Sequence, residues 1–115
     1  MDHVCLAFPI LPGKTADART FQQELDTTRK AEYAVSEKRM KVHREYWYLA
    51  ESPNGDLLIA FFDTDDLNAA VGAFIQSQDP FDLWFKQSLK EVTGVDFENL
   101  PPGLKLPELV STFEA

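Results

Sequence analysis

The chain has 115 residues, a length typical of one domain built around one hydrophobic core. It carries 19 Asp plus Glu against 11 Lys plus Arg, and this net charge of −8 argues against nucleic acid or an anionic membrane surface as a partner. No apolar run approaches the roughly 20 residues that span a bilayer. The sequence opens without a secretory leader, and its single cysteine has no internal partner, so we expect one cytoplasmic domain over residues 1–115.

The first third of the chain predicts a strand followed by one long helix. Val4–Ile10 is short and apolar and is broken by Pro12-Gly13, which is typical of a strand that runs into a loop. Thr15 suits an N-cap, and one helical face follows at spacings of three, four and seven residues: Ala18, Phe21, Leu25, Thr28 and Val35. We expect this helix to end or bend near Met40, with a solvated face formed by Arg29, Lys30, Glu32, Glu37, Lys38 and Arg39.

The middle of the chain predicts a β-hairpin. Val42–Ala50 and Asp56–Asp63 have strand composition and are separated by Pro53-Asn54-Gly55. Asn-Gly between two such runs favours a tight turn, and a two-residue turn would place Trp47 opposite Phe62.

Two more helices and an extended segment are expected after the hairpin. Asp65 or Asp66 suits the N-cap of a helix whose apolar stripe includes Leu67, Ala70, Val71 and Phe74. Asp79-Pro80 suits the start of the next helix, and Gly94 suits its end. Prolines then make a connector, and Leu109–Glu114 fits either a last strand or a short tail helix.

The order of these elements is the ferredoxin-like βαββαβ plan. This is an α+β fold in which helices cover one face of an antiparallel sheet. Several stretches, in this order, also resemble a known family: LPGK at 11–14, EYWYL at 45–49, DDL at 65–67 and SQDPFD at 77–82. They are similar to small uncharacterised bacterial proteins of the dimeric α/β-barrel superfamily, over about residues 4–95.

The resemblance implies a homodimer in which two four-stranded sheets face each other as a barrel, in some members around a ligand pocket. That superfamily includes cofactor-free monooxygenases, haem-degrading enzymes and members without known activity. It has no common set of catalytic residues, so the resemblance assigns none to this chain.

The second predicted strand carries the residues that suggest a site. Alternate residues of a strand share a face, so His43, Glu45 and Trp47 point the same way. We expect the helices to cover the other face, formed by Val4, Leu6, Phe8, Leu57, Ile59 and Phe61. The face away from the helices would line the dimer interior, and its candidate ligand-binding residues are His3, His43, Glu45, Trp47 and Phe62. In this plan His3 and His43 lie roughly 10 Å apart, a gap that a small ligand can bridge.

Each of these residues also has a structural interpretation. His3 and His43 fit hydrogen-bonded structural roles as well as ligand contacts. Glu45 fits a solvated sheet edge, a salt bridge, or a desolvated acid or base. The acids at 63–66 lack the pattern of a calcium loop and are explained by helix capping, and Cys5 is expected to be a small buried hydrophobe.

Two functions fit this pattern. The first is a ligand-binding or structural homodimer that takes a small apolar ligand. The second is a cofactor-independent enzyme, an oxygenase or an isomerase, in which His43 or Glu45 moves a proton while Trp47 and Phe62 hold the substrate. The sequence has no nucleotide loop, metal motif or nucleophile signature, so we expect neither cofactor nor metal. An enzyme would need a closed pocket of about 300 Å³ or more with converging polar groups.

Overall fold

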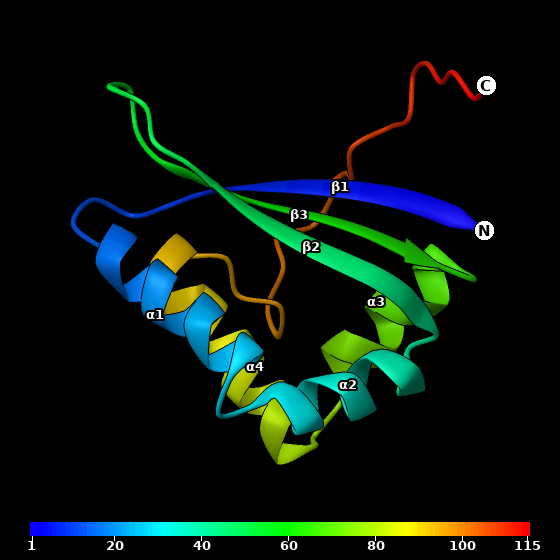
Figure 1. Cartoon of the computed structure of the whole chain (residues 1–115), viewed down its shortest axis with the longest axis horizontal. Coiled ribbons are helices and arrows are strands. Elements are labelled where there is room, and N and C mark those ends of the chain that lie inside the picture. Colours follow the sequence, from blue (N-terminus) through cyan, green and yellow to red (C-terminus); the bar gives the residue numbers. More distant parts are fainter.

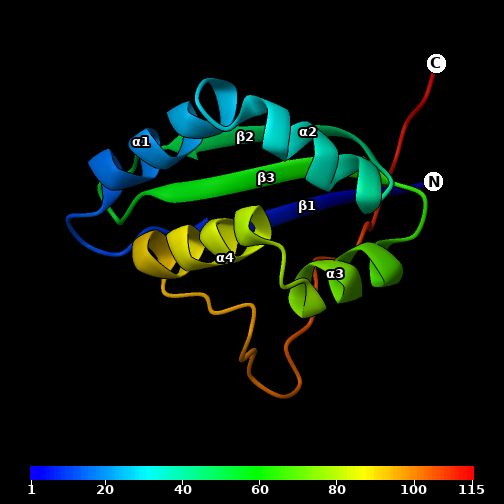
Figure 2. The ribbon, with the colours of Figure 1, turned by 90° about the horizontal axis from the view of Figure 1, so that it is seen from below.

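A three-stranded antiparallel sheet carries all four helices on one side (Figures 1 and 2). The computed structural model describes residues 1–115. The strands are β1 (Asp2–Pro9), β2 (Val42–Ala50) and β3 (Leu57–Thr64), in the spatial order β1-β3-β2. The helices are α1 (Thr15–Asp26), α2 (Lys30–Arg39), α3 (Leu67–Gln76) and α4 (Pro80–Thr93). The predicted α+β class, with an antiparallel sheet and helices on one face, is confirmed.

The predicted last element is absent. Residues 101–115 are exposed and form neither the strand nor the tail helix expected at Leu109–Glu114. Pro101, Pro102 and Pro107 all precede Leu109, and no strand of the sheet pairs with residues 109–114. The element order is therefore compatible with the ferredoxin-like plan up to its second helical unit, and the sheet has three strands.

The helix predicted to run from Thr15 to about Met40 is two helices. α1 ends at Asp26 and α2 begins at Lys30. The break falls at two β-branched threonines, and the Thr27 hydroxyl donates to the carbonyl of Gln23, which competes with the helical pattern. The new direction of α2 leaves Val35 exposed and turns Glu37 inward, and Thr28 in the break is exposed. The expected faces therefore hold for α1 and are wrong at these three positions.

The pairing of the strands keeps the expected faces of β1, where Val4 and Phe8 are buried on the helix side, and reverses those of β2 and β3. Residues 51–56 connect β2 to β3, so Trp47 lies opposite Ala60 and Glu45 lies opposite Phe62. In the other pair, Val4 lies opposite Phe62, so β1 and β2 place these side chains on one face of β3. The helices cover that face. The prediction that Glu45, Trp47 and Phe62 lie on the face away from the helices is therefore wrong. Residues 57–62 of β3 are apolar at every position, so alternation could not choose between its two faces.

The other face of the sheet carries no helix (Figure 1). Tyr46 and Tyr48 of β2 are 48% and 59% exposed there. Cys5 is also exposed, so its expected burial is wrong. We call this surface the open face, and its apolar and aromatic members are Cys5, Ala7, Tyr46, Tyr48, Ile59 and Phe61.

The ends of α3 and α4 follow the predicted capping chemistry. The Asp66 carboxylate accepts a hydrogen bond from the Ala69 N–H at 3.1 Å, and the Asp79 carboxylate accepts one from the Phe81 N–H at 3.0 Å. Gly94 ends α4 in the left-handed conformation, with φ of 77°. None of the four helices combines the length and apolar character needed to cross a membrane.

Candidate functional site

An apolar pocket lies between the sheet and helices α3 and α4. Hydrophobic residues make up 13 of the 14 that line it, and Glu45 is the exception. The rings around it are Phe8, Trp47, Phe62, Phe74, Phe85 and Phe97. Its free volume is about 70 Å³, room for about five waters or one very small molecule. This is well below the roughly 300 Å³ of a pocket for a drug-sized ligand.

Glu45 is held by two hydrogen bonds that both reach the same carboxyl oxygen. The Tyr33 hydroxyl donates to Glu45 Oε2, and the Trp47 Nε1–H donates to it at 3.0 Å. Glu45 Oε1 has no hydrogen-bond partner in the chain, and Glu45 forms no ion pair. Burial raises the pKa of Glu45, and the two donated hydrogen bonds only partly oppose this. Glu45 is half-buried and has no cationic partner, so of its three interpretations the geometry matches best a partly desolvated acid.

Glu37 of α2 is a second buried acid beside Glu45. Its Oε2 atom is buried without a hydrogen-bond partner. Burial, then the negative charges of Glu45 and Asp82, raises the pKa of Glu37 to about 9, so it holds its proton at neutral pH. Burial and the same two glutamates also raise the pKa of Tyr33. We call these three residues, Tyr33, Glu37 and Glu45, the acid cluster.

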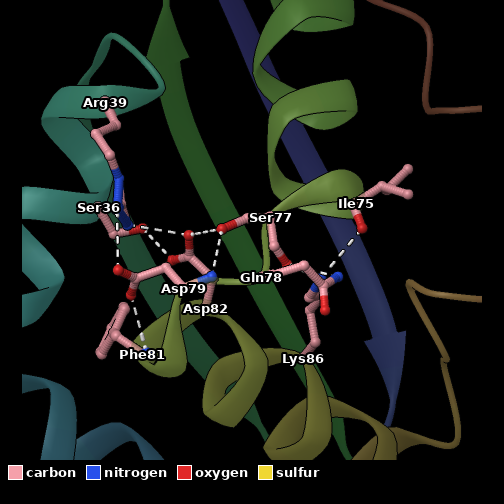
Figure 3. A network of polar contacts seen from close by, with 9 residues as sticks. All are labelled: Ser36, Arg39, Ile75, Ser77, Gln78, Asp79, Phe81, Asp82 and Lys86. Atoms are coloured by element: carbon pink, nitrogen blue, oxygen red, sulfur yellow. Dashed lines mark hydrogen bonds and ion pairs between the residues drawn. The ribbon is translucent and has the colours of Figure 1, made fainter.

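A polar network fixes α2, and with it two members of the acid cluster (Figure 3). Asp82 of α4, which is 2% exposed, accepts hydrogen bonds from Ser36 Oγ at 2.5 Å, Ser77 Oγ at 2.5 Å and Arg39 Nη2 at 3.0 Å. Lys86 Nζ, also buried, donates to the backbone carbonyls of Ile75 and Ser77 at 3.1 and 2.9 Å. The network joins α2, the end of α3 and the start of α4, so Glu37, the neighbour of Ser36, has a fixed place.

The two predicted histidines lie outside the pocket. His3 Nδ1 is 2.5 Å from Asp63 Oδ1, and Arg44 Nε donates to the other oxygen of Asp63 at 2.7 Å. The His3 contact, more than the Arg44 contact, lowers the pKa of Asp63. His43 lies at a bulge in β2, and its Nε2 is 2.6 Å from Asp65 Oδ1.

The structure therefore divides the five predicted residues. Glu45, Trp47 and Phe62 line one pocket, on the helix side of the sheet. Each histidine is occupied by its own aspartate, so the geometry gives no support to one ligand that bridges His3 and His43.

The sequence analysis missed Tyr33 and Glu37. A signal for both was present, because Tyr33, Ser36, Glu37 and Met40 recur at helical spacings of three and four residues. The signal was overlooked because one helix was expected from Thr15 to about Met40. The buried face of that helix was assigned from the residues before the break between α1 and α2. Of the pocket's other rings, Phe74 was predicted only as part of an apolar helical stripe.

The chain belongs to a family of unknown function (DUF6176), which matches residues 1–110. No curated protein and no solved structure matches the chain. The side chains also include no group of three or more His, Cys, Asp or Glu residues placed to hold a metal ion.

Proposed function

We propose that the protein binds a small, mostly apolar molecule with one oxygen atom, in the pocket between the sheet and helices α3 and α4. The observation that carries this proposal is the single carboxyl group in an otherwise apolar wall. Binding pockets of this kind take their affinity from apolar walls and their orientation from a few polar groups.

The hydrogen bonds and the protonation of Glu45 indicate which kind of ligand oxygen it would bind. Its Oε2 already accepts from Tyr33 and Trp47, so Oε1 is the atom left for a ligand. Burial favours the protonated acid, in which Oε1 carries the hydrogen and donates it. A carbonyl or ether oxygen accepts such a hydrogen bond. A carboxylate ligand would find no cation in this pocket, because Glu45 is the one polar residue that lines it.

A homodimer through the open face is part of the proposal. The apolar and aromatic side chains of that face are uncovered in the single chain, and contiguous surfaces of this kind mark interaction sites. The similarity to dimeric α/β-barrel proteins supports the same pairing. We expect about 1,600 Å² to be buried in total. Sedimentation velocity at micromolar concentration should show a dimer, and a monomer would contradict this part. We also propose that the protein is cytoplasmic, as expected from its sequence.

A second candidate function is cofactor-independent proton transfer on the same ligand. The observation that favours it is the pair of acids with raised pKa values, because a general acid or base works best when its pKa lies near the working pH. In this version the ionised form of Glu45 would take a proton from the carbon beside a carbonyl group, and the carbonyl oxygen of the ligand would gain the negative charge.

Cyclopentanone and cyclopentane make a matched pair of probes, because they differ in the carbonyl oxygen. We expect cyclopentanone to bind at least tenfold more tightly than cyclopentane in an NMR titration. Glu45→Leu should remove that preference, whereas Glu45→Gln keeps a donor of similar size and should retain it. His43→Ala is the control, since His43 lies outside the pocket. Equal binding of the two probes to the natural protein would overturn the proposal.

The same samples separate the enzyme from the binding protein. If the protein transfers protons, it will speed deuterium exchange at the carbon atoms beside the carbonyl of cyclopentanone in heavy water. Glu45→Gln should then abolish the exchange without loss of binding, because an amide is not a base at neutral pH. Binding without accelerated exchange would leave the first candidate alone.

A further inference from the structure

A groove runs along the outer edge of β2. One hollow of about 600 Å³ is lined by residues 45–49 of β2 and by α1 residues such as Gln22. A second, of about 270 Å³, is lined by residues 42–45 of β2 and by α2 residues such as Glu37. Consecutive strand residues alternate between faces, so a hollow that touches all of them follows the strand edge. The hollows share Leu25, Asp26, Tyr33 and Glu45, and together we call them the β2 groove.

The groove contains polar groups that have no partner. β2 is the last strand of the sheet on its side, so every second backbone N–H and C=O along it points away from β3. Gln22 Nε2, in the first hollow, and Glu37 Oε2, in the second, are also buried without hydrogen bonds. Buried polar atoms are nearly always paired in native proteins. An extended peptide offers alternating carbonyl and N–H groups, which would pair with the free backbone groups of the β2 edge.

The C-terminal part of the chain is an exposed segment that belongs to no helix or strand. Residues 104–113, here called the arm, form no helix or strand, and their large apolar side chains are exposed, from 37% at Leu106 to 88% at Phe113. Fully extended, the arm spans about 33 Å, against about 30 Å for β2. Lys30 of the groove and Glu108 of the arm have opposite charges, and neither forms an ion pair.

The arm does not fill the groove of its own chain. It passes β1 and continues on the side of the sheet that has no helix, whereas the groove lies between β2 and the helices (Figures 1 and 2). The open face, through which we expect two copies to meet, is on the same side as the arm. A second copy at that face can place its own β2 edge beside the arm.

We propose that the arm of one copy docks in the β2 groove of a second copy and adds a strand to its sheet. Leucine side chains of the arm cover the aromatic residues of the groove, and its backbone pairs with β2. Pro107, which has no N–H, is tolerated in an added strand because such a strand is itself an edge. The inference rests on the proposed homodimer and does not depend on the ligand pocket.

Disulfide trapping between full-length chains tests the docking. In a Cys5→Ser background, one preparation carries Leu109→Cys and the other carries Gln23→Cys, a groove residue on α1. Mixed and mildly oxidised, they should form a covalent heterodimer. Gln87→Cys, exposed on α4, replaces Gln23→Cys as the control and should give none. A disulfide formed within one diluted chain that carries both cysteines would overturn the exchange between copies.

Hydrogen exchange tests the docking without assuming which residues meet. In the full-length protein, Leu106→Asp with Leu109→Asp should speed exchange of the outward-facing β2 amides at least tenfold, while β3 amides stay unchanged. Unchanged β2 exchange in a chain that sediments as a dimer would overturn the arm proposal and leave the open-face dimer standing. A monomer would overturn both.

Discussion

The buried acid Glu37 makes the stability of the fold depend on pH in an unusual direction. The pKa of Glu37 rises from 4.5 to about 9 on folding, chiefly because the side chain is buried. Below pH 4.5 it is protonated in both states. Between pH 4.5 and about 9 the folded protein holds a proton that the unfolded chain has lost. Its favourable contribution is therefore fully present below pH 4.5 and is lost as the pH rises toward 9.

The size of the effect follows from the shift. Each pH unit within the window lowers the free energy of unfolding by up to about 1.4 kcal/mol. The largest possible loss between pH 5 and pH 8 is therefore about 4 kcal/mol. Partial access of water to Glu37 reduces this, and we expect at least about 2 kcal/mol. Glu37→Gln stays neutral at every pH and should lose this dependence. The free energy of unfolding of the variant, minus that of the natural protein, should grow by at least about 2 kcal/mol from pH 5 to pH 8.

Urea unfolding followed by circular dichroism at pH 5, 6, 7 and 8 measures that difference. Subtraction cancels shared groups that do not interact with Glu37, and it leaves the coupled pair of Glu37 and Glu45. Asp63 and Asp65, whose pKa values are lowered by their histidine partners, lose their contributions below pH 4, outside the window. Glu32→Gln, on the exposed side of α2, is the control and should show no growth with pH. A difference for Glu37→Gln that stays constant within about 0.5 kcal/mol would refute the reasoning.

Two further predictions concern stability. Asp82→Ala should lower the free energy of unfolding by about 3 kcal/mol, because Ser36, Ser77 and Arg39 lose their shared acceptor. Urea unfolding measures this loss, and a value below about 1 kcal/mol would contradict a structural role for the network. Gly94→Ala should cost about 1–2 kcal/mol for its φ of +77° alone, since the added Cβ would lie 3.5 Å from Leu11, an ordinary contact. Gly103→Ala is its matched control, because Gly103 has φ of +79° in a segment without helix or strand. An equal loss of stability in Gly103→Ala would contradict the idea that Gly94 matters because it ends α4.

The features that sequence reasoning predicted well are local ones. Asp66, Asp79 and Gly94 cap their helices because each needs only its own neighbours to do so. The alternation in β2 likewise put Glu45 and Trp47 on one face, and these two residues do share a pocket with Phe62.

The features that were missed depend on contacts between distant parts of the chain. Which face of β3 meets the helices depends on its register with β1, and its uniformly apolar sequence carries no preference. The inward turn of Glu37 depends on the break at Thr27-Thr28 and on Asp82, which is 45 residues further along the chain. The site was therefore predicted on the right strand and on the wrong side of the sheet.

The two tryptophans have different surroundings, and this gives the acid cluster an optical reporter. Trp47 donates its indole hydrogen to Glu45 and stacks on Phe8, with ring centroids 6.1 Å apart. Trp84 lies under the guanidinium of Arg29, whose Cζ is 4.1 Å from the ring centroid, and that cation keeps its charge at all ordinary pH values. Ionisation of Glu45, or a ligand bound to it, changes the electric field most strongly at Trp47, the indole that is hydrogen-bonded to it. The natural fluorescence of the protein thus reads the state of one carboxyl group without any label.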